Sequence, residues 1–355
     1  MTTSQTDTSR RVLEVLRFAV PWDASVAVVG REVEDIGRRV VTPLARDGET
    51  DLSADAAIAR LEALRADGCE YLVVGASGLD WLDARPGFTA HLDTDYRLVD
   101  RDDDACAVYA VHGAGERTGA DGLPLPPVDM IRITQGLYRR AANPDLLYQR
   151  FENTGAETAG WIRDILTRNG AAIEDMGAVM DFGCGCGRVT RYLKDLPGSV
   201  HGSDYNPHLV HWCAAHLAFG EFRTNDAEPP LPYDDDSFDF LYSISIFTHL
   251  DEPLQVPWMR ELARVVRPGG LLLITVMGED RLRSIPAWEH LREPFEAGEL
   301  VVTKPERAGS NACAVYHPQE YVRETLAGSL EIVDYEAGSP AAVRQDGILL
   351  RTPVS

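Results

Sequence analysis

The chain has 355 residues, of which 34 are basic and 56 are acidic, so its formal net charge is −22. Such an acidic surface repels phosphate backbones and anionic lipids. We therefore expect no nucleic acid and no membrane surface as partners, and we expect a small-molecule substrate. Hydrophobic residues make up 45% of the chain, and the length predicts a folded protein of two domains.

The sequence also indicates a cytoplasmic protein. No apolar run approaches the roughly 20 residues that a membrane helix needs, and the polar first residues lead into no signal-like segment. The six cysteines are scattered along a long chain, which favours free thiols in a reducing compartment over a disulfide framework.

Residues 1–115 predict a small α/β domain. Short apolar runs alternate with a segment that has apolar residues at helical spacing and ends at a glycine. The predicted elements are strands at 25–30, 70–76, 96–100 and 106–113 and a helix at 54–68.

A stretch rich in glycine and proline follows, and we place a domain boundary there. Residues 116–177 predict a linker with helices interrupted at Asn143–Pro144 and at Gly155.

From residue 178 to the end, strands and helices alternate regularly. The predicted strands are 178–183, 199–205, 221–226, 238–246 and 270–276, and the predicted helices are 188–196, 207–217 and 258–266. This alternation predicts a parallel sheet with both faces covered. The last two predicted strands, 330–338 and 347–353, leave no room for a helix between them, which indicates a closing antiparallel hairpin.

The stretch MDFGCGCGR, residues 180–188, has three glycines at every second position between a strand and a helix. A zinc site at Cys184 and Cys186 lacks the second ligand pair that structural zinc needs, so no metal is expected. Glycines in this context allow main chain to approach a ligand closely or to adopt positive φ. Asp204 ends the next strand, about 20 residues on, where a ribose diol finds its acceptor. The pattern therefore predicts a nucleoside site.

The spacing Gly183, Gly185, Gly187 after Asp181 resembles motif I of class I S-adenosylmethionine-dependent methyltransferases, and later stretches resemble further motifs of that family up to about Val276. The resemblance implies a Rossmann-like methyltransferase sheet, mostly parallel with a C-terminal antiparallel hairpin, in residues 178–355. It implies S-adenosylmethionine as the cofactor and a helical lid over it in residues 116–177. Tyr138 and Tyr148 are candidates to contact the ligand from this lid, although plain packing explains them equally well. The cofactor-binding residues that it implies are Asp181, Gly183, Cys184, Gly185, Asp204, Tyr205, Asn225, Asp226, Ala227 and Ser243.

Catalytic residues are harder to derive, because the cofactor supplies the reactive methyl group and positioning supplies much of the rate. His249, His317 and Tyr316 are candidates for a general base, and each is also explained by a structural role. Arg188 could meet a carboxylate or lie on the surface. Further pocket candidates are Trp288, His290 and Phe295.

We therefore predict a methyltransferase acting on a small molecule, first on an oxygen of a sugar or natural-product intermediate. Nitrogen or carbon acceptors, aminopropyl transfer on the same fold, and a non-catalytic cofactor-binding module are the alternatives. The N-terminal domain resembles small α/β modules found beside glycosyltransferases in surface-sugar or natural-product pathways. We also consider a homodimer.

Overall fold

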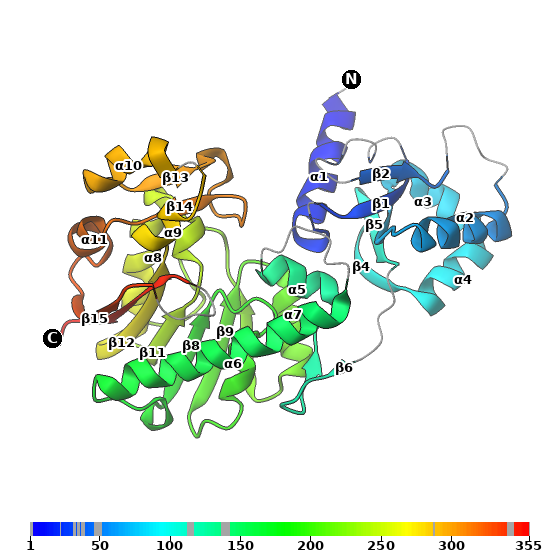
Figure 1. The fold of residues 1–355 in the computed structure, drawn as a ribbon. Coiled ribbons are helices and arrows are strands. Elements are labelled where there is room, and N and C mark those ends of the chain that lie inside the picture. The colour runs from blue at the N-terminus through cyan, green and yellow to red at the C-terminus, as the bar shows by residue number, and fades with distance from the viewer. Residues whose placement is uncertain are drawn as a thin grey trace. The chain divides into compact units, whose positions relative to one another are not determined.

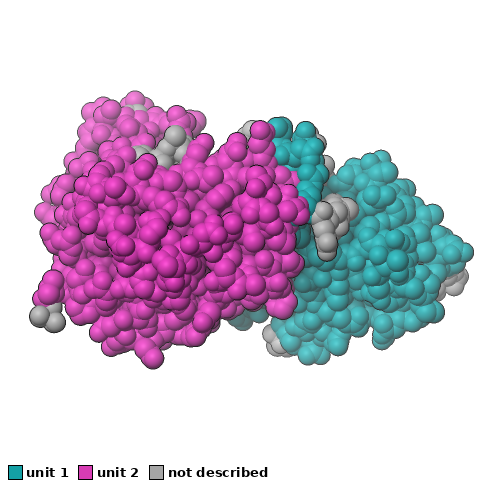
Figure 2. All heavy atoms as spheres, turned by 90° about the horizontal axis from the view of Figure 1, so that it is seen from below, with its two compact units in different colours: residues 1–117, 127–147 teal, residues 118–126, 148–355 magenta. Residues whose placement is uncertain are grey.

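The structure is a computed structural model that describes residues 3–21, 23–30, 33, 36, 40–45, 52–111, 117–135, 143–286, 288–338 and 344–354. The chain forms two compact units, which Figure 2 shows in different colours. One comprises residues 1–117 and 127–147, and the other comprises residues 118–126 and 148–355. The segment 116–177, expected from the sequence as a linker and lid, contributes to both units.

The first unit contains a five-stranded sheet in the order β2-β1-β3-β5-β4. Strand β1 pairs in parallel with β2 and β3, whereas β5 is antiparallel to β3 and β4. The strands are β1 (Ser25–Val29), β2 (Val40–Pro43), β3 (Tyr71–Gly75), β4 (Arg97–Asp102) and β5 (Cys106–Ala110), and the helices are α1 (Thr3–Ala19), α2 (Ala54–Ala66), α3 (Ala76–Asp83), α4 (Pro86–Asp95) and α5 (Val128–Gln135).

Side chains of the central strands alternate between two apolar cores, one on each face of this sheet. In β1, Val26 and Val28 face one core, and Ala27 and Val29 face the other. Strands buried on both faces are expected to read as continuous apolar runs, which is why β1, β3 and β5 were predictable.

Helix α5 belongs to this unit because a buried arginine attaches it. Arg132 pairs with Asp23 at 2.7 Å and with Glu70. A buried guanidinium without such partners would be costly. Residues 127–135, which the sequence placed in the lid, are therefore held by the first unit.

The second unit contains a seven-stranded sheet in the order β10-β9-β8-β11-β12-β16-β15. The first five strands are mutually parallel, and β16 runs antiparallel to both β12 and β15. This arrangement confirms the predicted Rossmann-like sheet. The strands are β8 (Ala178–Phe182), β9 (Ser199–Asp204), β10 (Gly220–Thr224), β11 (Phe238–Ser243), β12 (Val266–Val276), β15 (Glu331–Glu336) and β16 (Asp346–Arg351).

Helices cover both faces of the sheet (Figure 1). Ile162 and Ile165 of α6 pack against Val179, Phe240 and other side chains of one face. Leu262 of α8 packs in the core of the opposite face. The helices are α6 (Pro144–Arg168), α7 (Pro207–His216), α8 (Glu252–Val265), α9 (Glu279–Arg283), α10 (Trp288–Glu296) and α11 (Gln319–Tyr321), with a π-helical turn at Val322–Leu326 and 3-10 turns at Ile173–Asp175, Thr190–Leu193, Phe247–His249 and Pro305–Arg307. The short strands β6 (Arg117–Thr118), β7 (Pro124–Leu125), β13 (Val301–Thr303) and β14 (Ala314–Tyr316) form two small hairpins.

The structure corrects the sequence prediction at residues 188–196, which form turns and a 3-10 turn, Thr190–Leu193, instead of a helix. Thr190 donates its hydroxyl to Asp181 at the end of β8, at 2.5 Å. The Arg191 side chain is fully buried and pairs with Asp121. These side-chain contacts fix the segment in place, and it therefore forms turns although its apolar residues have helical spacing.

The structure also corrects the predicted break at Gly155, because α6 continues through it. A β-carbon at Gly155 would overlap the main-chain oxygen of Arg188 and come within 2.8 Å of the Tyr192 ring. Glycine stands here because the helix backbone approaches the segment after the glycine turn, not because the helix ends.

We therefore predict opposite effects for two glycines of α6. Gly155→Ala should lower the free energy of unfolding by about 1–3 kcal/mol, because the added methyl group has no room. Gly160→Ala, where a β-carbon meets nothing within 4 Å, should raise it by up to about 1 kcal/mol, because alanine favours the helix. Urea unfolding followed by circular dichroism measures both, and equal stabilisation by the two substitutions would contradict the close approach.

Candidate functional site: a glycine turn at the carboxyl end of the central strand

The glycine turn follows β8, whose neighbours β9 and β11 lie on opposite sides of it. Gly183, Gly185 and Gly187 have φ of 82°, 55° and 76°, a region that glycine adopts readily. A β-carbon at Gly183 would overlap Ile246, and one at Gly187 would lie 2.5 Å from Leu217. The glycines are thus required by the backbone conformation and by packing within the protein, in addition to any ligand.

Asp204, the last residue of β9, closes this turn. Its Oδ2 accepts a hydrogen bond from the Gly185 amide at 2.9 Å, and its Oδ1 accepts one from the Asn206 amide at 2.8 Å. The side chain is 6% exposed, and burial raises the pKa of Asp204 to about 6. The Tyr205 main-chain amide also donates to this carboxylate. The two oxygens together accept about four hydrogen bonds, so the carboxylate retains capacity for about one further donor.

Asp181 lies at the end of β8 and is also buried. Besides the Thr190 hydroxyl, it accepts a hydrogen bond from the Tyr242 hydroxyl at 2.9 Å. Burial raises the pKa of Asp181 to about 6, although both hydrogen bonds oppose this shift. Arg188 is half-buried and donates to the Thr154 carbonyl of α6 at 3.2 Å, so it is not a surface arginine.

The predicted adenine-binding segment follows β10. The Asn225 amide donates to the Asp204 carbonyl at 3.2 Å, and the Asn225 side chain accepts from Ser203. Asp226 and Ala227 are exposed, and the Ala227 carbonyl accepts from the Trp258 indole at 3.1 Å. The structure therefore brings the ends of β9 and β10 together.

Of two further predicted cofactor residues, one lies within the turn and one follows β9. Tyr205 follows Asp204 and is half-buried. Cys184 is buried, and the neighbouring Cys213 thiol, followed by burial, raises the pKa of Cys184 well above its usual range. Cys184 is therefore a neutral thiol within the turn.

Ser243, the last residue of β11, differs from the other predicted residues because its hydroxyl lacks a partner. The residue is 0% exposed, and among the described atoms its Oγ meets no hydrogen-bond partner. A buried unpaired hydroxyl costs stability. Ser243 ends β11, which pairs in parallel with β8 just before the glycine turn.

The three candidate bases lie in different surroundings. The His249 ring nitrogen Nδ1 lies 2.7 Å from the Cys313 carbonyl oxygen, to which it donates, and burial lowers the pKa of His249. Tyr316 is buried in a small apolar cluster, and burial raises its pKa. His317 is 0% exposed, and burial lowers its pKa to about 3.

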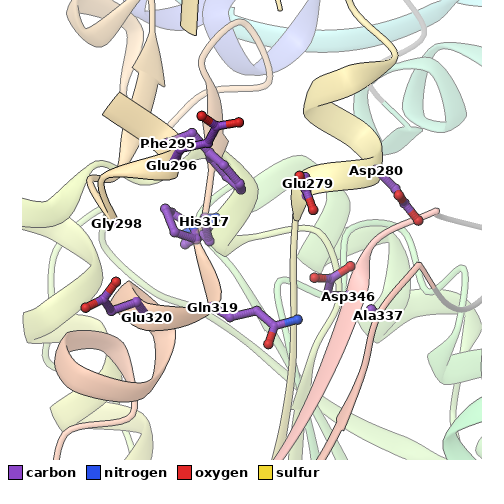
Figure 3. A pocket seen from close by; sticks show the side chains of 11 residues that line it. Glu279, Asp280, Phe295, Glu296, Gly298, His317, Gln319, Glu320, Ala337 and Asp346 are labelled. Carbon is purple, nitrogen blue, oxygen red and sulfur yellow. The ribbon is translucent and has the colours of Figure 1, made fainter. Parts of the chain in front are cut away.

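A cavity of about 330 Å³ opens near the carboxyl end of β12 (Figure 3). His317 and the buried Asp346, the first residue of β16, lie in its wall, together with the predicted pocket residue Phe295. The remaining lining residues are Glu279, Asp280, Glu296, Gly298, Pro318, Gln319, Glu320 and Ala337.

The other predicted contacts are not brought to one place. Tyr148 is buried on α6, and His290 is exposed on α10. Trp288 is the first residue of α10, and Tyr138 lies outside the described residues.

Several residues that support the candidate site side chains escaped the sequence analysis. Tyr242 and Thr190 hold Asp181, and Gln255 bonds to His317 at 3.2 Å. They come from separate elements, so no local pattern marks them. Their only signal in the sequence was position: Tyr242 is the penultimate residue of a strand that points at the crevice.

No group of three or more His, Cys, Asp or Glu that could hold a metal occurs within the part of the chain that the structure describes. Nor does any described helix have the length and apolar character required to cross a bilayer.

Comparison with known proteins bears on residues 180–274, which match the family described as "Methyltransferase domain". "Methyltransferase GfsG" from Streptomyces halstedii is 35% identical over 107 residues, which are 27% of this chain and 36% of that protein. "Fatty-acid O-methyltransferase" from Mycolicibacterium smegmatis is 35% identical over 116 residues, 31% of this chain and 40% of that protein. The match thus spans about two fifths or less of these relatives.

Among solved structures, the 1,6-didemethyltoxoflavin-N1-methyltransferase of Burkholderia thailandensis is 17% identical, with a TM-score of 0.41, over 57% of this chain and 79% of that chain. The matched residues 180–274 begin just before the glycine turn and end within β12, so they contain Asp181, Asp204 and Ser243. Residues 180–274 thus match a methyltransferase domain family, in agreement with the resemblance of their motifs to S-adenosylmethionine-dependent methyltransferases.

Proposed function

We propose that the protein transfers a methyl group from S-adenosylmethionine to a small-molecule acceptor, first an oxygen of a sugar or natural-product intermediate. The observation that carries this proposal is Asp204, whose buried carboxylate closes the glycine turn and retains capacity for a further hydrogen-bond donor. A ribose hydroxyl is such a donor.

The remaining residues fit the same ligand. In this proposal Asp204 accepts from the ribose hydroxyls, with Tyr205 beside the adenosine, and the main chain of Gly183, Cys184 and Gly185 lies along the cofactor. Asn225, Asp226 and Ala227 border the adenine after β10. The cofactor supplies an electrophilic methyl group on a sulfonium, and Asp181, ionised above a pH of about 6, faces its ammonium group.

Proton removal from the acceptor is assigned to His249 as the first candidate. At neutral pH its lowered pKa leaves the imidazole uncharged, and its Nδ1 is committed to the Cys313 carbonyl. Nε2 is then the nitrogen that can accept a proton. His317, with a pKa of about 3, is too weak a base for this role at neutral pH, and Tyr316 is buried among apolar side chains.

Oxygen as the acceptor atom agrees with the name of the fatty-acid O-methyltransferase, although that relative is matched over 40% of its length only.

We also propose that the N-terminal unit serves a pathway of surface-sugar or natural-product assembly, as the modules that it resembles do. A cytoplasmic location, a homodimer and domain limits at 115 and 177 stay predictions.

The first test of this function replaces Asp204 by asparagine. The amide keeps the size of the side chain but loses the charge and one acceptor atom, so S-adenosylhomocysteine should bind at least about tenfold more weakly, as expected for loss of charged hydrogen bonds of about 1.5–3 kcal/mol. Isothermal titration calorimetry measures the affinity.

Asp195→Asn is the matched control, because Asp195 is exposed and lies outside the turn. It should leave affinity unchanged. A folded Asp204→Asn protein that binds S-adenosylhomocysteine as tightly as the unaltered protein would contradict the ribose assignment.

A second test separates ligand binding from stability at Ser243. Ser243→Ala removes a buried hydroxyl that lacks a partner, so the free energy of unfolding should rise by about 1 kcal/mol. If the hydroxyl contacts the cofactor, affinity for S-adenosylhomocysteine should fall several-fold at the same time. Thermal unfolding with and without ligand measures both effects, and increased stability with unchanged affinity would remove Ser243 from the cofactor site.

A further inference from the structure

We propose that Trp258 of α8 positions residues 225–227, the segment that borders the adenine, and so determines how sharply the protein distinguishes adenine from other bases. This inference rests on the proposed function, because it concerns the same cofactor site. Trp258 acts through the main chain of Ala227 and not through contact with the cofactor, so it is a positioning residue.

The segment 225–227 is held from β9 at its first residue. The Asn225 amide donates to the Asp204 carbonyl at 3.2 Å, and the Asn225 side chain accepts from Ser203. Asp226 and Ala227, in contrast, are exposed. Because exposed loop backbone is mobile unless contacts hold it, the position of the last residue of this segment depends on a contact of its own.

Trp258 supplies this contact. Its indole nitrogen donates to the Ala227 carbonyl at 3.1 Å, and the residue is 2% exposed. An indole N–H can only donate, and a buried one needs an acceptor. The Ala227 carbonyl therefore cannot move away without leaving a buried donor unpaired, which is costly.

The same side chain also contacts the strand that leads into the glycine turn. The rings of Trp258 and Phe182 have centroids 4.7 Å apart, and Phe182, the last residue of β8, immediately precedes Gly183. One buried side chain thus links the start of the glycine turn with the end of the adenine-bordering segment. It fixes the spacing between the two parts of the proposed cofactor site.

Two further residues of α8 hold the loop that continues from Ala227 toward β11. Glu261 accepts a hydrogen bond from the Leu231 amide at 2.7 Å, and Arg264 donates to the Tyr233 carbonyl at 3.0 Å. Arg264 also donates to Glu261 at 2.5 Å and 2.9 Å, so that each side chain orients the other. Helix α8 therefore fixes the loop backbone at two points beyond Ala227.

The three residues of α8 occur at intervals of three along the helix, and their partners follow in the same order along the loop. Residues three apart are neighbours on a helix surface. Trp258, Glu261 and Arg264 hold residues 227, 231 and 233. A shift of the loop by one residue would break all three contacts, so the helix sets the register of the loop.

A fixed backbone matters most for selection of the base. A site that hydrogen-bonds a base rejects another base strongly when its polar groups cannot rearrange and are left unpaired. Asp226 lies between Asn225 and Ala227, which are both held, so its carboxylate is carried by a backbone that is fixed on both sides. We therefore expect hypoxanthine, in which an oxygen replaces the amino group of adenine, to bind weakly.

The test replaces Trp258 by phenylalanine, which keeps an aromatic ring beside Phe182 but lacks the N–H group. Affinities of the full chain for S-adenosylhomocysteine and S-inosylhomocysteine are measured by isothermal titration calorimetry. Affinity for S-adenosylhomocysteine should fall about three- to tenfold, as for loss of one hydrogen bond. Affinity for the inosine analogue should change less than about twofold, so the preference for adenine should narrow.

Trp161→Phe is the matched control. The Trp161 indole of α6 donates to Glu336 at the same distance, 3.1 Å, but Glu336 belongs to β15, at the opposite edge of the sheet from β10. This variant should leave both affinities unchanged. If Trp258→Phe weakens both ligands by the same factor, or neither, Trp258 has only a general structural role and the proposal is overturned.

A second measurement observes Trp258 without altering it, and so does not depend on the folding of a variant. In protein labelled with ¹⁵N at tryptophan, the indole N–H resonance of Trp258 should shift when S-adenosylhomocysteine binds. It should not shift with homocysteine, which lacks the adenosine, and the Trp161 resonance should shift with neither.

The outcomes of this measurement separate the inference from the function on which it rests. Binding of S-adenosylhomocysteine with an unchanged Trp258 resonance would overturn the positioning role and leave the proposed function standing. Failure of the unaltered protein to bind S-adenosylhomocysteine at all would overturn the proposed function, and the inference with it.

Discussion

One buried carboxylate holds the candidate site together. Asp204 accepts main-chain hydrogen bonds from Gly185 in the glycine turn and from Asn206 at the start of α7. A charged acceptor in a place with little water forms strong hydrogen bonds but is costly to bury, and the raised pKa of Asp204 records that cost. The turn after β8 and the end of β9 thus share one anchor.

The parallel sheet places the other candidate residues at the same edge as Asp204. Because β8, β9, β10 and β11 run in the same direction, their carboxyl ends bring Asp181, Asp204, Asn225 and Ser243 to one edge. The strand order reverses at β8, and open α/β sheets bind ligands at such a point. The cavity that Asp346 and His317 line lies near the end of β12.

Local sequence patterns predicted the buried strands and the start of a helix. Features that depend on contacts between residues far apart in the sequence were missed. Apolar runs marked the buried strands, and Asn206–Pro207 marked the start of α7, where the Asn206 side chain caps the helix. Gly155 was wrongly predicted to break a helix, because its close approach to Arg188 is visible only in three dimensions. The spacing of Gly183 to Asp204 identified the turn, whereas the partnership of His317 with Gln255 follows from no pattern, since the two residues are 62 positions apart.

The most direct test is the structure of the protein crystallised with S-adenosylhomocysteine. The account predicts both ribose hydroxyls within hydrogen-bond distance of the two oxygens of Asp204, with the purine beside the segment after β10. A nucleoside bound elsewhere, or an Asp204 carboxylate that contacts only main-chain amides while the ribose lies beyond its reach, would contradict the account.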